Sequence, residues 1–111
     1  MARVAALAPD LFFASKIDAT LSAAGHEVVV VGSVEEALAA RADVVVADLH
    51  APGLDAAALA KGEAPVLGFY THVDEAARDR GRDAGFALVV PRSRMAREMP
   101  QLISHLTGDI G

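Results

Sequence analysis

Five short apolar stretches, regularly spaced along the chain, limit the possible folds more than any other feature. Each is rich in β-branched or other apolar residues and lacks the alternation of apolar and polar positions that a half-exposed strand shows. Continuous apolarity indicates strands that are covered on both faces, as in a parallel sheet. We therefore expect strands at about Val4–Ala8, Glu27–Val31, Asp43–Ala47, Pro65–Phe69 and Ala87–Val90.

Segments with helical signals lie between these strands. Ser33, for example, is followed three residues later by Glu36, which matches a capping box. We expect helices from Asp10 to Gly25, Ser33 to Ala40, Asp55 to Lys61, Asp74 to Gly85 and Met95 to Leu106. Strands that alternate with helices in this way predict a doubly wound α/β fold with a five-stranded parallel sheet and helices on both faces.

The composition fits a single globular domain, which we expect to span residues 1–111. Hydrophobic residues make up 53% of the chain and charged residues 23%. The formal charge of −5 argues against binding to nucleic acid or to an anionic membrane surface. The chain has no cysteine, which excludes a thiolate metal site or a thiol nucleophile. No apolar run approaches the roughly 18 residues of a membrane span, and we expect a bacterial cytoplasmic protein.

Two carboxylates stand where expected strands end. Asp10 follows the first apolar run and Asp48 follows the third. The carboxyl ends of parallel strands meet at one edge of the sheet, where open α/β folds place their ligand sites, so the two acids predict one functional site. Each also has a simpler structural interpretation. Asp10 would cap the first helix, and Asp48 would cap the turn that follows it.

The order of elements, the two strand-end acids and the segment Asp48-Leu49-His50-Ala51-Pro52-Gly53 resemble the receiver domain of bacterial two-component response regulators. The resemblance covers about Arg3 to Leu106 and implies a flavodoxin-like sheet of order 2-1-3-4-5. It also implies that Asp48 accepts a phosphoryl group from a histidine kinase, with Mg²⁺ held by Asp10, Asp48 and the main-chain carbonyl of His50. A cation is needed there because it neutralises the negative charges that approach each other during transfer.

Several positions depart from the receiver pattern. Receivers carry two adjacent acids after the first strand, whereas here Pro9 precedes the one acid, which weakens metal binding. Tyr70 replaces the small hydroxyl expected after the fourth strand, and Thr71 follows it; both are candidates to contact a phosphoryl group. Arg92 matches the usual Lys as a third such candidate, with the same charge but a different geometry. Val89 stands where an aromatic switch residue is expected, so the usual coupling of a hydroxyl to a swinging ring lacks a partner.

These departures favour a degenerate receiver, or pseudo-receiver, that acts in signalling through protein contacts. The alternative is an atypical receiver that is still phosphorylated on Asp48. No Ser-His-Asp arrangement, Gly-rich phosphate loop or paired general acid and base is present, so the sequence predicts no enzyme. We expect a histidine kinase or another signalling protein as partner, and weakly bound Mg²⁺ as the candidate cofactor.

A third interpretation follows from the spacing of Asp48, His50 and Gly53. It also fits the D-x-H-x-x-G signature of cobalamin-binding domains, whose His coordinates cobalt. That signature belongs after the first strand of its domain, whereas here it follows the third. The accompanying Ser-x-Leu occurs only as Ser104-x-Leu106 in the final helix, and no Gly-Gly pair is present. A small-molecule or cobalamin-type site is therefore the weakest of the three interpretations.

A candidate partner surface surrounds the start of the last helix. The simplest interpretation of its basic residues is a solvated helix start. The sharper one is an output or homodimer surface formed by the fourth helix, the fifth strand and the last helix. Arg94 and Arg97 share one side of the helix there, and Met95 and Met99 mark a neighbouring stripe. Contact with a partner predicts that both methionines are partly exposed, whereas a core role predicts that both are buried.

Overall fold

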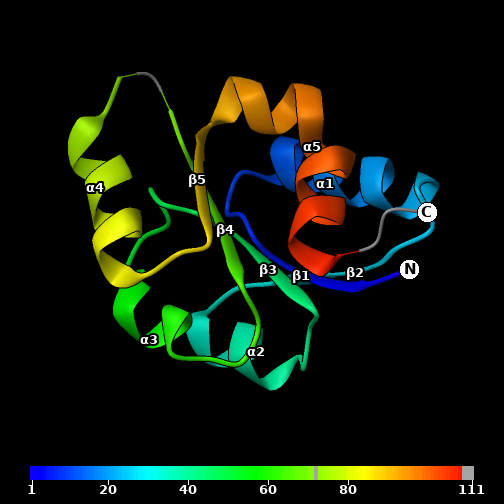
Figure 1. Cartoon of the computed structure of the whole chain (residues 1–111), viewed down its shortest axis with the longest axis horizontal. Coiled ribbons are helices and arrows are strands. Elements are labelled where there is room, and N and C mark those ends of the chain that lie inside the picture. Colours follow the sequence, from blue (N-terminus) through cyan, green and yellow to red (C-terminus); the bar gives the residue numbers. More distant parts are fainter. Residues whose placement is uncertain (72, 109–111) are drawn as a thin grey trace.

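The computed structural model describes residues 1–71 and 73–108, in which a five-stranded sheet forms the centre of the molecule (Figure 1). The strand order is β2-β1-β3-β4-β5, and all neighbouring strands are parallel. The strands are β1 Arg3–Leu7, β2 Glu27–Val31, β3 Val44–Asp48, β4 Val66–Tyr70 and β5 Leu88–Pro91. The flavodoxin-like fold and its sheet order are therefore confirmed, with strand bounds within one residue of those expected.

Helices cover both faces of the sheet. Figure 1 shows α1 and α5 together on one side and α2, α3 and α4 on the other. The helices are α1 Leu11–Ala23, α2 Val34–Ala39, α3 Ala56–Ala60, α4 Glu75–Ala84 and α5 Arg92–Thr107. Within the described ranges, no helix has the length and apolarity needed to cross a membrane.

The apolar strands separate two hydrophobic clusters. In β3, Val44 and Val46 face one cluster, whereas Val45 and Ala47 face the other, because successive side chains of a strand point to opposite faces. The helical residues of the α1–α5 core are Phe13, Ala14, Ile17, Leu21, Met95, Met99, Leu102 and Ile103. The α2–α3–α4 core contains, beside strand residues, Val34, Ala37, Leu49, Leu59, Ala77 and Phe86. The strands therefore lack alternating polar residues because both faces of the sheet are covered, as expected from the sequence.

Side-chain caps begin four of the helices, and the sequence predicts two of these caps, at Asp10 and Ser33. Asp10 Oδ1 accepts hydrogen bonds from the main-chain N–H groups of Phe12 at 2.9 Å and Phe13 at 3.3 Å, so its role as an N-cap is confirmed. Ser33, Asp55 and Asp74 cap α2, α3 and α4 in the same way. α4 ends at Ala84 and is followed by its C-cap Gly85, whose φ of 100° suits a residue without a side chain.

The last helix departs most from the expected bounds. It begins at Arg92 instead of Met95, directly after the extended backbone of Pro91. It is also kinked, since Glu98 has φ −119° and ψ 19°. Pro100 explains the kink, because it lacks an N–H and its ring crowds the carbonyl four residues earlier.

Met95 and Met99 are buried, so the prediction that they contact a partner is wrong. Both have 0% exposure and lie in the α1–α5 core. Together with Leu102 and Ile103 they form the stripe of α5 that packs against α1 and the sheet. The spacing of the two methionines therefore reflects the face of α5 that packs against α1 and the sheet. Arg94 and Arg97 lie on its exposed side.

Candidate functional site

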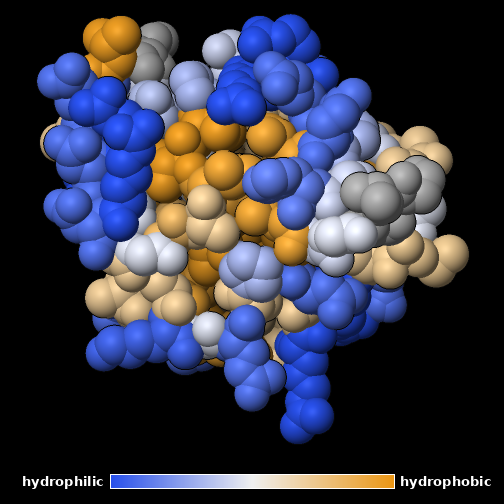
Figure 2. All heavy atoms as spheres, in the orientation of Figure 1, coloured by the Kyte–Doolittle hydropathy of each residue, from blue (hydrophilic) through white to orange (hydrophobic). Residues whose placement is uncertain are grey.

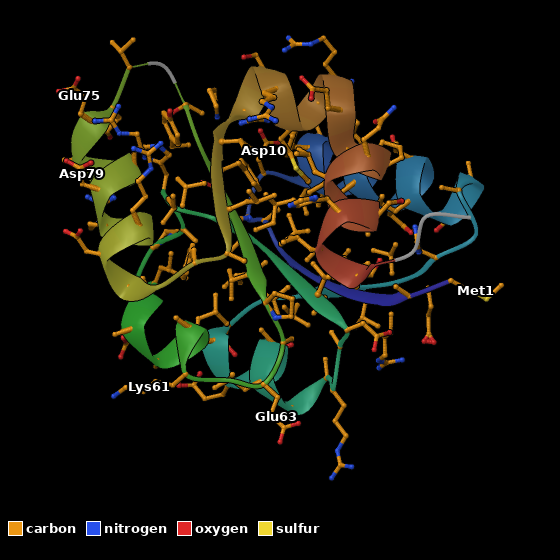
Figure 3. All side chains as sticks on the ribbon, in the orientation of Figure 1. Met1, Asp10, Lys61, Glu63, Glu75 and Asp79 are labelled. Atoms are coloured by element: carbon orange, nitrogen blue, oxygen red, sulfur yellow. The ribbon has the colours of Figure 1, made fainter. Side chains whose placement is uncertain are left out.

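The carboxyl ends of the strands bring the predicted site residues to one edge of the sheet. Asp10 follows β1, Asp48 ends β3, Tyr70 ends β4, and β5 leads directly into α5 at Arg92. The register of β3 with β4, and of β4 with β5, aligns these ends. Figure 3 shows Asp10 beside the first turn of α5, with Lys61 at the opposite edge of the molecule. The shared edge expected from the sequence is present.

Asp48 is the buried acid of this edge. It is 8% exposed, and its Oδ1 accepts a hydrogen bond from the main-chain N–H of His50 at 2.8 Å. This contact is the local turn that the simpler interpretation of Asp48 predicted. It orients the carboxylate at the start of the loop between β3 and α3.

Asp10 is bound by a cation from the protein itself. Its Oδ2 lies 2.8 Å from Nη2 of Arg92, and the Arg92 guanidinium carbon lies 4.1 Å from the centre of the Phe13 ring. The Arg92 hydrogen bond, followed by the N–H group of Phe13, holds the pKa of the Asp10 carboxyl below its usual range. The ring beneath the guanidinium adds a favourable cation–π contact. Arg92 is thus held toward α1 by a hydrogen bond at the edge of its guanidinium and by a ring beneath one face.

The ring of His50 joins two loops of the edge. Its Nε2 accepts a hydrogen bond from the main-chain N–H of Thr71 at 3.1 Å and lies 3.2 Å from the Thr71 hydroxyl. Its Nδ1 lies 3.9 Å from Oδ2 of Asp74, the residue that caps α4. The sequence analysis considered the carbonyl of His50 as a Mg²⁺ ligand and its ring as a cobalt ligand, and missed this contact of the ring with Thr71. No local signal marks it, because the bonded residues are 21 positions apart.

The two candidates at the end of β4, Tyr70 and Thr71, both contact other parts of the protein. Tyr70 is half-buried and packs against the α2–α3–α4 core. Thr71 turns its hydroxyl toward the ring of His50. The structure therefore brings Tyr70, Thr71 and Arg92 to the predicted edge, but each side chain has a contact within the protein.

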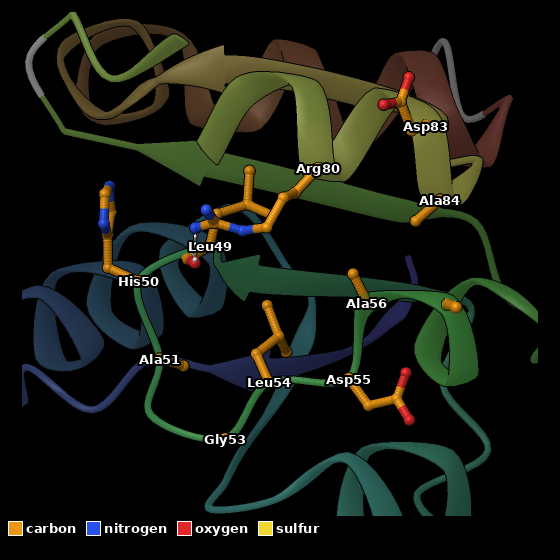
Figure 4. A pocket seen from close by; sticks show the side chains of 11 residues that line it. Leu49, His50, Ala51, Gly53, Leu54, Asp55, Ala56, Arg80, Asp83 and Ala84 are labelled. Carbon is orange, nitrogen blue, oxygen red and sulfur yellow. Dashed lines mark hydrogen bonds between the residues drawn. The ribbon is translucent and has the colours of Figure 1, made fainter. Parts of the chain in front are cut away.

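A groove of about 960 Å³ lies between α4 and the loop that follows Asp48. Figure 4 shows the Arg80 guanidinium reaching across it, and Nη2 of Arg80 donates a hydrogen bond to the carbonyl of Leu49 at 3.2 Å. The sequence analysis also missed this contact, which joins α4 to the residue directly after Asp48.

The side chains at this edge do not fit Mg²⁺ well. Oδ1 of Asp10 accepts two N–H groups and Oδ2 binds Arg92, so both of its oxygens are already engaged. Within residues 1–71 and 73–108, no three acidic or histidine side chains are grouped to hold a metal ion. Mg²⁺ prefers several oxygen ligands and releases its water reluctantly. A metal ion at Oδ2 of Asp10 would share that oxygen with the Arg92 guanidinium.

Comparison with known proteins identifies the fold. No protein-family model matches the chain, and no curated protein matches its sequence. A putative response regulator from Chloroflexus aurantiacus superposes with a TM-score of 0.83 at 22% identity, over 96% of this chain and 98% of that one. The receiver domain of the Francisella response regulator 1452 gives a TM-score of 0.81 at 20% identity over 100% of both chains. This chain has the receiver fold.

Longer proteins contain the same fold as one part. NtrX from Brucella abortus, in a structure with ATP, has a TM-score of 0.82 at 19% identity, and the match covers 96% of this chain but 27% of NtrX. The chain thus spans little more than a quarter of that protein. The TM-scores establish the receiver fold, whereas the low identities mean that the chemistry of the site has to be argued from the residues present here.

The receiver fold also places the cobalamin-like residues apart. His50 lies at the carboxyl edge, with its ring bonded to Thr71. Ser104 and Leu106 lie in the last turns of α5, which starts at that edge and runs away from it. A helix rises about 1.5 Å per residue, so these positions are roughly 20 Å along α5 from its start. They do not form one site with His50.

Proposed function

We propose that this chain is a degenerate receiver module that acts in signalling through protein contacts in the cytoplasm and has no catalytic role. The observation that carries this proposal is the 2.8 Å ion pair between Arg92 and Asp10. It sets a protein cation on the carboxylate where the receiver resemblance implies a metal ion. A guanidinium fixed at this position competes with Mg²⁺ for Oδ2 of Asp10. We therefore expect Mg²⁺ to bind weakly.

The other candidate phosphoryl contacts support the same proposal. The Thr71 hydroxyl faces the His50 ring, and Tyr70 packs against the α2–α3–α4 core. If Tyr70, Thr71 or Arg92 contacts a phosphoryl group on Asp48, that side chain has to leave its present contact. This reorganisation disfavours phosphorylation relative to a site whose donors are already directed at the acceptor.

Phosphorylation of Asp48 by a histidine kinase is the second candidate function. One observation favours it: among the described residues, no ion pair engages the Asp48 carboxylate, although Asp10 beside it is paired. In this function Arg92 turns from Asp10 to the phosphoryl oxygens, and Thr71 releases His50 to donate its hydroxyl.

Incubation with acetyl phosphate, with and without Mg²⁺, separates the two functions. We expect intact mass spectrometry to detect no phosphoryl adduct on the wild type under either condition. Asp48→Asn, which keeps the size of the side chain, is the matched control. A phosphoryl adduct on the wild type that Asp48→Asn lacks would replace the first proposal with the second.

A partner surface on the α4–β5–α5 side fits the first proposal. β5 is an edge strand with half-buried Leu88 and Val89, and Figure 2 shows apolar surface in the region of β5 between α4 and α5. Arg94 and Arg97 are exposed beside it, each within ion-pair distance of Glu98. An apolar centre with a charged rim suits a signalling protein or a second copy of this chain.

Sedimentation of the wild type and of Arg94→Glu/Arg97→Glu tests whether the partner is a second copy. A wild-type dimer that dissociates in the variant supports a second copy. Monomers in both proteins leave a different protein as the partner.

A further inference from the structure

The three consecutive residues Asp48, Leu49 and His50 each make a different contact that fixes their loop. The Asp48 carboxylate accepts the N–H group of His50 at 2.8 Å. The Leu49 carbonyl accepts a hydrogen bond from Arg80, in the middle of α4, at 3.2 Å. The His50 ring accepts the N–H group of Thr71, at the end of β4, at 3.1 Å. One short segment is therefore bonded both to α4 and to the chain that leads into it.

Packing beneath these bonds leaves little freedom between the segment and α4. The Leu49 side chain is 3% exposed, and a Cβ atom added to Gly81 of α4 would lie 3.1 Å from its Cδ1. A Cβ added to Gly68 of β4 would lie 3.2 Å from the same atom. Glycine at these two positions allows α4 and β4 to approach Leu49 closely, so a displacement of Leu49 meets helix and strand backbone directly.

The hydrogen bond from the Thr71 N–H group to His50 depends on whether Nε2 of the ring carries a proton. Nε2 accepts the Thr71 N–H group only while it carries no proton. The charged group that faces the ring from the α4 side is Asp74, with its Oδ2 3.9 Å from Nδ1. The Thr71 hydroxyl faces the ring from β4. A ligand or modification at Asp48 that attracts the Thr71 hydroxyl competes directly with His50.

We propose that the His50 ring and the Arg80 guanidinium form a two-point latch that holds α4 and the β4–α4 loop to the residues after Asp48. Through this latch a change at Asp48 is transmitted to α4, in place of the aromatic residue that Val89 replaces at β5. The transmission rests on Asp48 being the input site, as in the second candidate function, in which Asp48 is phosphorylated. The latch itself is a property of the unmodified protein and is tested without any phosphodonor.

Hydrogen–deuterium exchange of the whole chain tests the latch. His50→Phe keeps a flat ring and removes the acceptor, and Arg80→Met keeps the stem and removes the donors. We expect the Thr71 amide to exchange about five- to tenfold faster in His50→Phe than in the wild type. We expect the same increase for the α4 amides in the double variant His50→Phe/Arg80→Met. A change of this size corresponds to the loss of about one net hydrogen bond. His50→Gln retains an acceptor near the position of Nε2 and should restore most of the protection.

Two controls separate release of the latch from general unfolding. His105→Phe/Arg82→Met makes the same chemical changes at exposed positions of α5 and α4, and should leave exchange as in the wild type. Protection in β1 and α1 should stay unchanged in every variant. Wild-type exchange of Thr71 and α4 in His50→Phe/Arg80→Met would overturn the latch, whatever the phosphodonor experiment finds.

Discussion

The two sides of the Asp48 site are held by different chemistry. On the α1–α5 side, Asp10 and Arg92 form an ion pair, and the guanidinium lies over the ring of Phe13. On the α4 side, the bonds from Thr71 to the His50 ring and from Arg80 to a carbonyl each end on a main-chain group. Opening the first side separates opposite charges, whereas opening the second does not. The comparison indicates a fixed side at α5 and a releasable side at α4.

The two hydrophobic clusters also differ in how they are packed. The α1–α5 core is filled by long side chains such as Met95 and Met99, both with 0% exposure. The α4 side relies instead on the absence of side chains at Gly68 and Gly81, where Phe86 and Leu49 lie close to the backbone. One side is therefore sensitive to removal of atoms, and the other to their addition.

Met99→Ala should have the largest effect. Truncating a fully buried methionine leaves a cavity, and we expect the free energy of unfolding to fall by about 2–5 kcal/mol in a urea titration. Met99→Leu, which nearly conserves volume, should cost less than about 1.5 kcal/mol. A stable Met99→Ala that loses only self-association would contradict the core assignment and return Met99 to an interface.

Gly68→Ala should destabilise the α4 side by about 1–3 kcal/mol, because its Cβ would lie 2.7 Å from Cδ2 of Phe86. Gly32→Ala is the matched control, since a Cβ there meets no atom nearer than Glu36 Oε1 at 3.6 Å. Thermal unfolding of both variants measures the difference. Equal stabilities would show that Phe86 moves aside freely and that α4 is not held closely.

Arg92→Met should raise the pKa of Asp10 toward its usual range, because the hydrogen bond from Arg92 contributes most to lowering that pKa. A depressed carboxyl pKa stabilises the folded state above the unfolded pKa of about 3.9, and this contribution is lost as the pH falls through the folded pKa. The wild type and Arg92→Met should therefore converge in stability at low pH. NMR titration of the Asp10 carboxyl measures the shift, and Arg92→Lys should preserve part of it.

The same variant sharpens the comparison of the two sides. Removing the guanidinium frees Oδ2 of Asp10, so Arg92→Met should bind Mg²⁺ more tightly than the wild type in a calorimetric titration. Arg80→Met removes a cation from the α4 side and should leave Mg²⁺ affinity unchanged. Equal affinities in the wild type and Arg92→Met would refute competition between Arg92 and the metal.

Arg97→Gln should have the smallest effect. Its pairing with Glu98, at 3.1 Å, is exposed to solvent. Surface ion pairs contribute about 0–1 kcal/mol and are screened by salt, so we expect a change in the free energy of unfolding within about 0.5 kcal/mol. A loss above about 2 kcal/mol in urea titrations would mean that Arg97 supports the kink at Glu98.

The sequence by itself determined the elements and their order. Unbroken apolar strands required helices on both faces, and capping residues such as Asp10 and Ser33 act through hydrogen bonds within three residues, so they set helix starts locally. The shared edge of Asp10 and Asp48 followed from parallel strands alone. These features depend on residues that are neighbours in the sequence or on the spacing of apolar residues, and both can be read directly from the sequence.

Only the tertiary structure decided what each site side chain contacts. Arg92 meets Asp10 across 82 residues and His50 meets Thr71 across 21, and nothing local selects these partners. The stripe of Met95 and Met99 was visible in the sequence, but helical periodicity specifies a stripe without saying what covers it. Burial against α1 and the sheet made it core. Contacts over such separations depend on how complete elements pack, and that is decided by the fold as a whole.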